Sequence, residues 1–197
     1  MTTVNFVVHP EEGAEQRTDV DVLGVRFPYR AELLNQPMVD DTPFTEEKIR
    51  PYVVIGEVKK DRCKLNGPWT RRDDRNMHRV LTAVGAVHPR EQDAAAEALY
   101  TSGIFQGESV LVSLCCVGAI ESREVRRDFK FVPQILWPQM TGFIFQRFES
   151  YLYQKLSHPQ WDQTGKLLWE LFVSSHSADE FGGAVQNRLS PRASWRG

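Results

Sequence analysis

An apolar run of this sequence ends abruptly in two charged residues, Glu57 and Lys59, on either side of Val58. Residues i and i+2 of an extended chain point to the same face, so we expect the carboxylate and the ammonium to project together. Carboxylates bind hard divalent cations such as Mg²⁺ or Mn²⁺ through oxygen, and such a cation polarises a phosphoryl group and acidifies bound water. A nearby lysine orients or deprotonates that water and offsets developing negative charge. The triplet therefore suits the hydrolysis of a phosphodiester bond.

A metal site of this kind needs a second carboxylate, and Asp21 is our first choice. It lies in an earlier run of alternating acidic and apolar residues, which is typical of a strand. If that strand pairs antiparallel with the strand that ends in the triplet, Asp21 lies near Glu57 and Lys59. The backbone carbonyl of Val58 is a further expected metal ligand.

Three other acidic residues compete for places at this site. Asp40 and Asp41 are alternatives to Asp21. We prefer Asp21 because a strand holds a ligand more rigidly than a loop does, and residues 29–50 read as a long loop. Asp19 is interpreted either as an outer ligand of the same site or as an exposed carboxylate at the strand edge.

Positive charge is concentrated directly after the triplet, although the formal net charge of the chain is −2. A protein with this balance does not coat nucleic acid through bulk electrostatics, so any phosphate-binding surface must be local. Between Glu57 and Arg79 lie eight of the 24 basic residues. Besides Lys59, the candidates for nucleic-acid binding are Lys60, Arg62, Lys64, Arg71, Arg72, Arg75 and Arg79. The alternative is a solvated helix face on which Asp73 and Asp74 pair with nearby arginines.

The periodicity predicts an α/β domain that brings these residues together. We expect strands at 4–8, 18–27, 52–59, 109–118 and 133–137, and helices from Asp73 or Asp74 to 84, at 90–101, at 138–156 and at 163–174. A single domain is predicted over 1–177, with a core at about 4–120, a helical part at about 138–175 and a loose tail at 178–197. In the helix at 138–156, Phe145 and Tyr153 fall off the main apolar face, which suggests a surface for a second copy or a partner protein.

The composition argues against several other classes of protein. The chain has 197 residues, of which 41% are hydrophobic and 25% charged, as in ordinary globular proteins. Three cysteines, two of them adjacent, make neither a disulfide framework nor a zinc-ligand spacing. The N-terminus lacks the pattern of a signal peptide, and no apolar run approaches the roughly 18 residues of a membrane span. A cytoplasmic location without membrane contact is expected.

These motifs resemble those of a known nuclease superfamily. The run Asp19-Val20-Asp21-Val22-Leu23, followed later by Val54-Ile55-Gly56-Glu57-Val58-Lys59, is similar to the two motif strands of the PD-(D/E)XK, or restriction-endonuclease-like, superfamily. The run Asn76-Met77-His78-Arg79 resembles the helix that follows the motif in uncharacterised bacterial members. The resemblance covers about residues 4–120.

The resemblance implies a mixed sheet flanked by helices, Mg²⁺-dependent cleavage of DNA or less often RNA, and frequent dimerisation. Asp21 takes the place of the motif aspartate, Glu57 that of the second acidic residue and Lys59 that of the lysine. We therefore expect a metal-dependent endonuclease of restriction or defence character. The alternative is a catalytically silent module of nuclease fold that binds nucleic acid or a partner protein.

Overall fold

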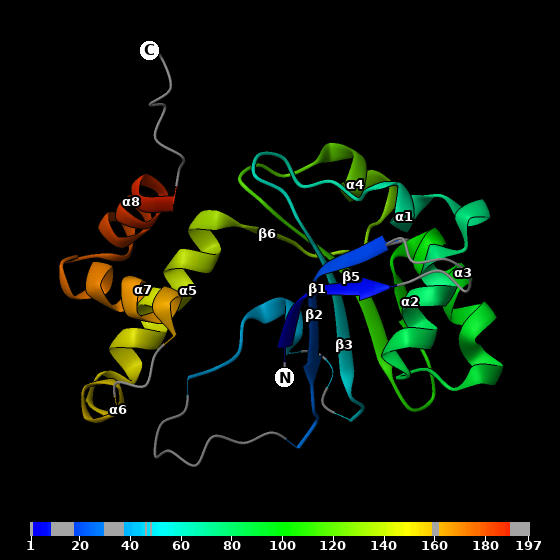
Figure 1. Cartoon of the computed structure of the whole chain (residues 1–197), viewed down its shortest axis with the longest axis horizontal. Helices are drawn as coiled ribbons and strands as arrows, with labels where there is room; N and C mark the ends of the chain where they lie inside the picture. The colour runs from blue at the N-terminus through cyan, green and yellow to red at the C-terminus, as the bar shows by residue number, and fades with distance from the viewer. Residues whose placement is uncertain are drawn as a thin grey trace. The chain divides into compact units, whose positions relative to one another are not determined.

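Six strands among the described residues form one mixed sheet (Figure 1). They are β1 (Thr2–Val8), β2 (Thr18–Arg26), β3 (Tyr52–Val58), β4 (Ile104–Gln106), β5 (Leu111–Gly118) and β6 (Gln134–Leu136). Their order is β1-β2-β3-β5-β4, and β6 also pairs with β5. β1, β2 and β3 are antiparallel neighbours, whereas β3 and β5 are parallel. The predicted α/β class, with a mixed sheet flanked by helices, is confirmed.

The computed structural model describes residues 2–8, 18–29, 38–45, 47, 49–158 and 162–189. The chain divides into two compact units, one of Met1–Glu32 with Asp40–Leu136 and one of Leu33–Val39 with Trp137–Gly197. The first unit contains the sheet, and the described part of the second consists mainly of helices. No helix of the described residues is both long enough and apolar enough for a membrane span.

The parallel pair β3 and β5 requires a crossover, and short helices provide it. These are α1 (Gly67–Thr70), α2 (Asn76–Val84) and α3 (Gln92–Ser102), with the 3₁₀ turns η2 (Arg72–Asp74) and η3 (Pro89–Glu91) between them. After β5 comes α4 (Arg123–Asp128), and η1 (Thr42–Phe44) precedes β3. β4 and α4 were not expected from the sequence.

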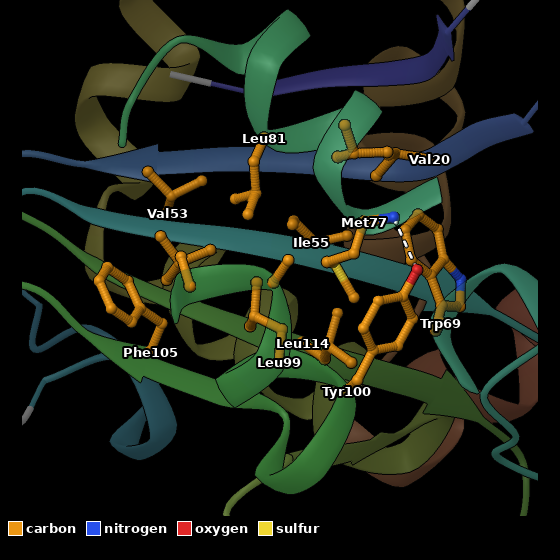
Figure 2. Close-up of a cluster of buried hydrophobic side chains, with 14 of the residues drawn as sticks. Val20, Val53, Ile55, Trp69, Met77, Leu81, Leu99, Tyr100, Phe105 and Leu114 are labelled. Carbon is orange, nitrogen blue, oxygen red and sulfur yellow. Dashed lines mark hydrogen bonds between the residues drawn. The ribbon is translucent and has the colours of Figure 1, made fainter. Parts of the chain in front are cut away.

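The core of the first unit lies between α2, α3 and one face of the sheet. Val53 and Ile55 of β3 point to this face, beside Leu114 of the neighbouring strand. Figure 2 shows Leu81 of α2 and Leu99 of α3 packed against them. Because alternate strand residues share a face, Glu57 points to this same helix-covered side.

The start of α2 differs from our prediction that Asp73 or Asp74 caps it. The helix begins at Asn76, after Arg75 in the left-handed conformation with φ 52°, and no side chain caps it. Instead, the buried hydroxyl of Tyr100 in α3 accepts a hydrogen bond from the backbone N–H of Met77 at 3.0 Å (Figure 2). A side chain 23 residues later thus supplies an acceptor that local spacing does not reveal. The helix ends where expected, at Val84, and Gly85 caps it with φ 66°.

The second unit corrects two expectations. The helix predicted at 138–156 is two helices, α5 (Trp137–Ser150) and α6 (Leu152–Ser157), with Tyr151 between them. They are followed by α7 (Gln163–Val173) and α8 (Ala178–Leu189). Residues 178–189 were expected to be loose but are helical. Their helix is stabilised because Phe181 and Val185 pack into an aromatic cluster. Residues 190–197 of the expected tail lie outside the described residues.

Candidate active site

The pairing of β2 with β3 ends just before Asp21 and Glu57. Their ladder ends at the pair Val22 and Gly56, although both strands continue beyond it. Val20 and Leu23 both belong to the helix-side core, so the alternation of β2 shifts by one residue between them. The facing strand β1 carries the matching irregularity, because Asn5 adopts φ 51° and interrupts the pairing opposite Asp21. At this shift Asp21 reaches the β2-facing edge of β3, where it meets Val58.

Asp21 takes over a hydrogen bond that the ladder no longer makes. Its Oδ2 accepts the backbone N–H of Val58 at 2.7 Å. The N–H and C=O of one extended residue point to the same strand edge, so the Val58 carbonyl also faces the β2 side. Asp21 thus lies against the triplet, as predicted, but at the edge of β3 and not on the face to which Glu57 points.

Glu57 is buried, with 4% of its surface exposed, and three donors surround its carboxylate. The indole Nε1–H of Trp69 donates to Oε2 at 2.7 Å. The amide of Asn66 and the ammonium of Lys59 both donate to Oε1. Glu57 and Lys59 therefore do meet on one side of β3, and the Lys59 side chain stays 27% exposed.

Asp40 does not lie beside this group, and Asp41 has a local role before β3. Asp40 forms an ion pair with Arg26 at 2.9 Å, and Arg26 is paired with Tyr52 at the start of β3. Tyr52 and Glu57 are five residue steps apart along the strand, a distance of about 16 Å. Asp41 caps η1 by accepting the N–H of Thr42. The structure favours Asp21 as the carboxylate next to the triplet.

Asp19 is exposed on β2, opposite Val7 of the edge strand. Among the described residues, no hydrogen bond or ion pair is recorded between Asp19 and the triplet. Its interpretation as an exposed strand carboxylate is the simpler one.

Asn66 and Trp69 were not recognised as site residues from the sequence. Trp69 packs in the core, with 1% exposure, and its indole N–H also meets Glu57. The contacts span nine and 12 residues across the loop after β3, so strand periodicity carries no signal for them.

The predicted basic residues fall into two groups. On the α1–α2 side, Arg72 pairs with Glu97 at 2.7 Å, Arg71 approaches Asp74 at 3.7 Å, and Arg79 donates to the Asp74 carbonyl. These contacts agree in part with the alternative of a solvated face with internal pairs. Arg75 is exposed there, and the described residues show no ion pair for it.

The second group of basic residues lies on the loop after β3. Lys60, Arg62 and Lys64 are all exposed. Arg62 donates to the carbonyl of Glu121 at 2.8 Å and bridges to Ile120, immediately before α4. The loop therefore lies beside α4, which carries the exposed residues Arg123, Arg126 and Arg127. Arg126 pairs with Glu121, and Arg127 pairs with Asp128.

The cysteines beside the site are not nucleophiles. Cys116 is the β5 partner of Glu57, and Cys115 is its neighbour. Burial raises the pKa of the Cys115 thiol to about 12 and that of Cys116 well above its ordinary value. Both thiols stay protonated near neutral pH, and the thiolate is the reactive form.

The donor set at this point fits a hard divalent cation in kind. A carboxylate has about four lone-pair positions, and three donors occupy those of Glu57, which leaves one on Oε2. In the described contacts Asp21 uses Oδ2 only. Oxygen atoms of Asp21, Glu57 and Val58 are the ligand type that Mg²⁺ and Mn²⁺ prefer. Among the described residues, no group of three or more His, Cys, Asp or Glu is arranged as a metal cluster.

Comparison of the chain with protein-family models, with curated proteins and with solved structures found no match.

Proposed function

We propose that this protein is a metal-dependent nuclease that hydrolyses phosphodiester bonds in nucleic acid. The observation that carries the proposal is that Asp21 and the Glu57-Val58-Lys59 triplet meet where β2 and β3 separate. Two carboxylates, a carbonyl and an ammonium at the end of a strand are the groups that this reaction requires. The proposal extends to membership of the PD-(D/E)XK superfamily, which the motifs resemble.

Each residue has a definite task in this proposal. Asp21, Glu57 and the Val58 carbonyl hold Mg²⁺ or Mn²⁺, and the bound cation supplies charge stabilisation and an acidified water. Lys59 forms an ion pair with Glu57 in the absence of substrate. Its partly exposed side chain then turns to the scissile phosphate, where it orients water and offsets negative charge.

The exposed basic residues indicate nucleic acid as the substrate. The exposed residues Lys60, Arg62 and Lys64 come soon after Lys59 in the chain. Phosphates of a nucleic acid that bind to them therefore lie near the site. DNA is the first expectation and RNA the second, with a restriction or defence role. A second copy or a partner protein remains a prediction for the region 138–156. Phe145 of that region is buried in the aromatic cluster, whereas Tyr153 and Leu156 of α6 are exposed.

The proposal is tested by incubating plasmid and single-stranded DNA with the protein and Mg²⁺ or Mn²⁺. We expect cleavage by wild type that EDTA abolishes, and its loss in Asp21→Ala and in Lys59→Ala. Retained cleavage in both variants would refute the site assignment. Single-stranded RNA in the same assay distinguishes the two substrates.

The second candidate, a silent nucleic-acid-binding module, is favoured by one specific observation. Three internal donors already satisfy most of the Glu57 carboxylate, as expected for a structural ion pair. Under this alternative, wild type binds DNA in EDTA but cleaves no substrate with any of the two cations. Filter binding or anisotropy beside the cleavage assay separates the candidates.

A further inference from the structure

We propose that Asn66 and Trp69 are positioning residues that hold the Glu57 carboxylate in place for cation binding. The proposal rests on the proposed function and adds two residues to its site. Neither residue touches substrate or cation; each acts through Glu57. They differ from Lys59 in charge, because Asn66 and Trp69 are neutral donors and Lys59 is a charged one.

The Asn66 side chain binds Glu57 and does not cap its own helix. It occupies the N-cap position of α1, where asparagine normally caps the helix with its own side chain. Here the Asn66 side chain makes no capping hydrogen bond and donates its amide to Oε1 of Glu57. Its backbone carbonyl meanwhile accepts the N–H of Trp69 at 3.0 Å, which ties the two donors together.

Trp69 is a rigid donor because its ring is enclosed. It is 1% exposed and belongs to the same core as Met77 and Tyr100 (Figure 2). Its Nε1–H has a single donor direction, and that direction ends on Oε2 of Glu57 at 2.7 Å in a buried setting. A buried donor and a buried acceptor thereby satisfy each other, and the carboxylate plane is fixed at both oxygens.

The charges explain why neutral donors matter here. Lys59 cancels the charge of Glu57 while it is bound to it, whereas Asn66 and Trp69 leave the full negative charge available. When Lys59 turns to a phosphate, Glu57 remains hydrogen-bonded and oriented by the other two donors. The carboxylate then faces a cation without having to be reordered. Hydrogen bonds of this kind to a ligand carboxylate typically change metal affinity by about 10–100-fold.

The experiment measures Mn²⁺ binding to the full chain by calorimetry, without nucleic acid. Trp69→Phe removes the N–H and keeps an aromatic ring, and Trp169→Phe in α7 is the matched control. Asn66→Ala tests the other donor at a half-buried position where folding is less at risk. We expect about 10–100-fold weaker binding for Trp69→Phe and Asn66→Ala and an unchanged affinity for the control. Circular dichroism and thermal melting verify that each variant is folded.

A second readout follows the hydrogen bond itself. The indole ¹H–¹⁵N resonance of Trp69 is identified as the one that Trp69→Phe removes. We expect it to shift when Mg²⁺ is added to wild type, and the Trp169 resonance to stay in place.

The outcomes separate the two proposals. Wild-type affinity in folded Asn66→Ala and Trp69→Phe overturns the positioning role and leaves the proposed function intact. If Trp69→Phe is unfolded, Asn66→Ala alone decides. Absence of Mn²⁺ binding and of any Mg²⁺-induced shift in wild type overturns both the metal-dependent function and the positioning role.

Discussion

At the scale of single residues, the two carboxylates of the site are held in different ways. A carboxylate that has lost its water is stable only when donors replace that water, and Glu57 has three. Asp21 instead serves the strand edge, where it replaces a missing ladder hydrogen bond to Val58. The two carboxylates thus have different surroundings, although they lie against the same triplet.

Gly56 permits a close approach of β2 to β3 at their last pair, Val22 and Gly56. A Cβ at Gly56 would lie 3.2 Å from the Val22 carbonyl oxygen and 3.3 Å from the Val22 Cβ, so the backbone of β2 would have to move. We expect Gly56→Ala to lower the free energy of unfolding by about 1–3 kcal/mol, as overpacking does. Gly24→Ala in β2 is the control, because its Cβ would meet only Val54 at 3.9 Å. Urea denaturation measures both, and equal midpoints for the two variants would argue against the close approach.

Part of the residue-scale site follows from the sequence, and part does not. The meeting of Glu57 with Lys59 follows from the two-residue period of a strand. The position of Asp21 beside Val58 depends on the coordinated irregularity at Asn5, which has no sequence signature of its own. Donors such as Trp69 arrive through tertiary packing, which local pattern does not encode.

At the scale of elements, the segment before β3 is fastened by a charged cluster. Glu47 accepts hydrogen bonds from Arg50 and from the backbone N–H of Ile49. Arg50 also donates to the carbonyl of Gly107 before β5. Arg26 of β2 donates to the Glu47 carbonyl at 3.2 Å. These bonds attach the segment to the end of β2 and to the turn before β5.

This cluster predicts a pH dependence of stability. Hydrogen bonds from the Arg50 backbone and side chain lower the pKa of Glu47 from 4.5 to about 2. A lowered folded-state pKa stabilises the protein above the unfolded value, and that contribution is lost as pH falls. We expect the stability difference between wild type and Glu47→Gln to be constant above pH 4.5 and to shrink as pH falls towards 2. Urea midpoints measured from pH 7 downwards test this, and a difference that grows in acid contradicts it.

The basic loop and α4 carry a second element-scale prediction. If both contact phosphates, each arginine replaced by alanine lowers the slope of log affinity against log salt by about 0.9 on duplex DNA. We expect this for Arg123→Ala and Arg126→Ala, and no change for Arg90→Ala in η3. Fluorescence anisotropy in EDTA makes the result independent of cleavage. Slopes equal to wild type would exclude α4 from the binding surface.

Most elements follow from periodicity and from glycine stops, whereas the failures have physical causes. The predicted ends of β2, β3 and α3 agree with the structure to within two residues. The helix α8 was missed because Gly182 and Gly183 weaken its intrinsic helix propensity, although Phe181 and Val185 have the four-residue spacing of one helix face. Burial in a cluster of aromatic side chains outweighs that weakness.

At the scale of the whole molecule, each compact unit has its own hydrophobic core. The core of the sheet unit includes Leu99, and that of the helical unit centres on Phe145, Phe148 and Phe181. The ring centroids of Phe145 and Phe172 lie 5.1 Å apart in an edge contact. Separate cores predict separate responses to a core substitution.

We expect Phe181→Ala to destabilise the helical unit by about 3–5 kcal/mol and Leu99→Ala to destabilise the sheet unit by about 2–5 kcal/mol. Both side chains are fully buried, at 0% exposure. Hydrogen exchange resolved along the chain should show faster exchange in α5, α7 and α8 for Phe181→Ala and in β3, β5 and α2 for Leu99→Ala. Equal acceleration throughout the chain in both variants would show that the two cores unfold together.

Our proposal places Asp21, Glu57 and Lys59 in one metal-dependent hydrolytic site. The most direct measurement compares the rate of Mg²⁺-dependent plasmid cleavage by wild type with that by Glu57→Gln, which keeps the shape of Glu57 and removes its charge. We expect cleavage by folded wild type and a loss of at least about 100-fold in the variant, because a cation ligand is gone. A Glu57→Gln protein that cleaves at the wild-type rate would contradict the proposal.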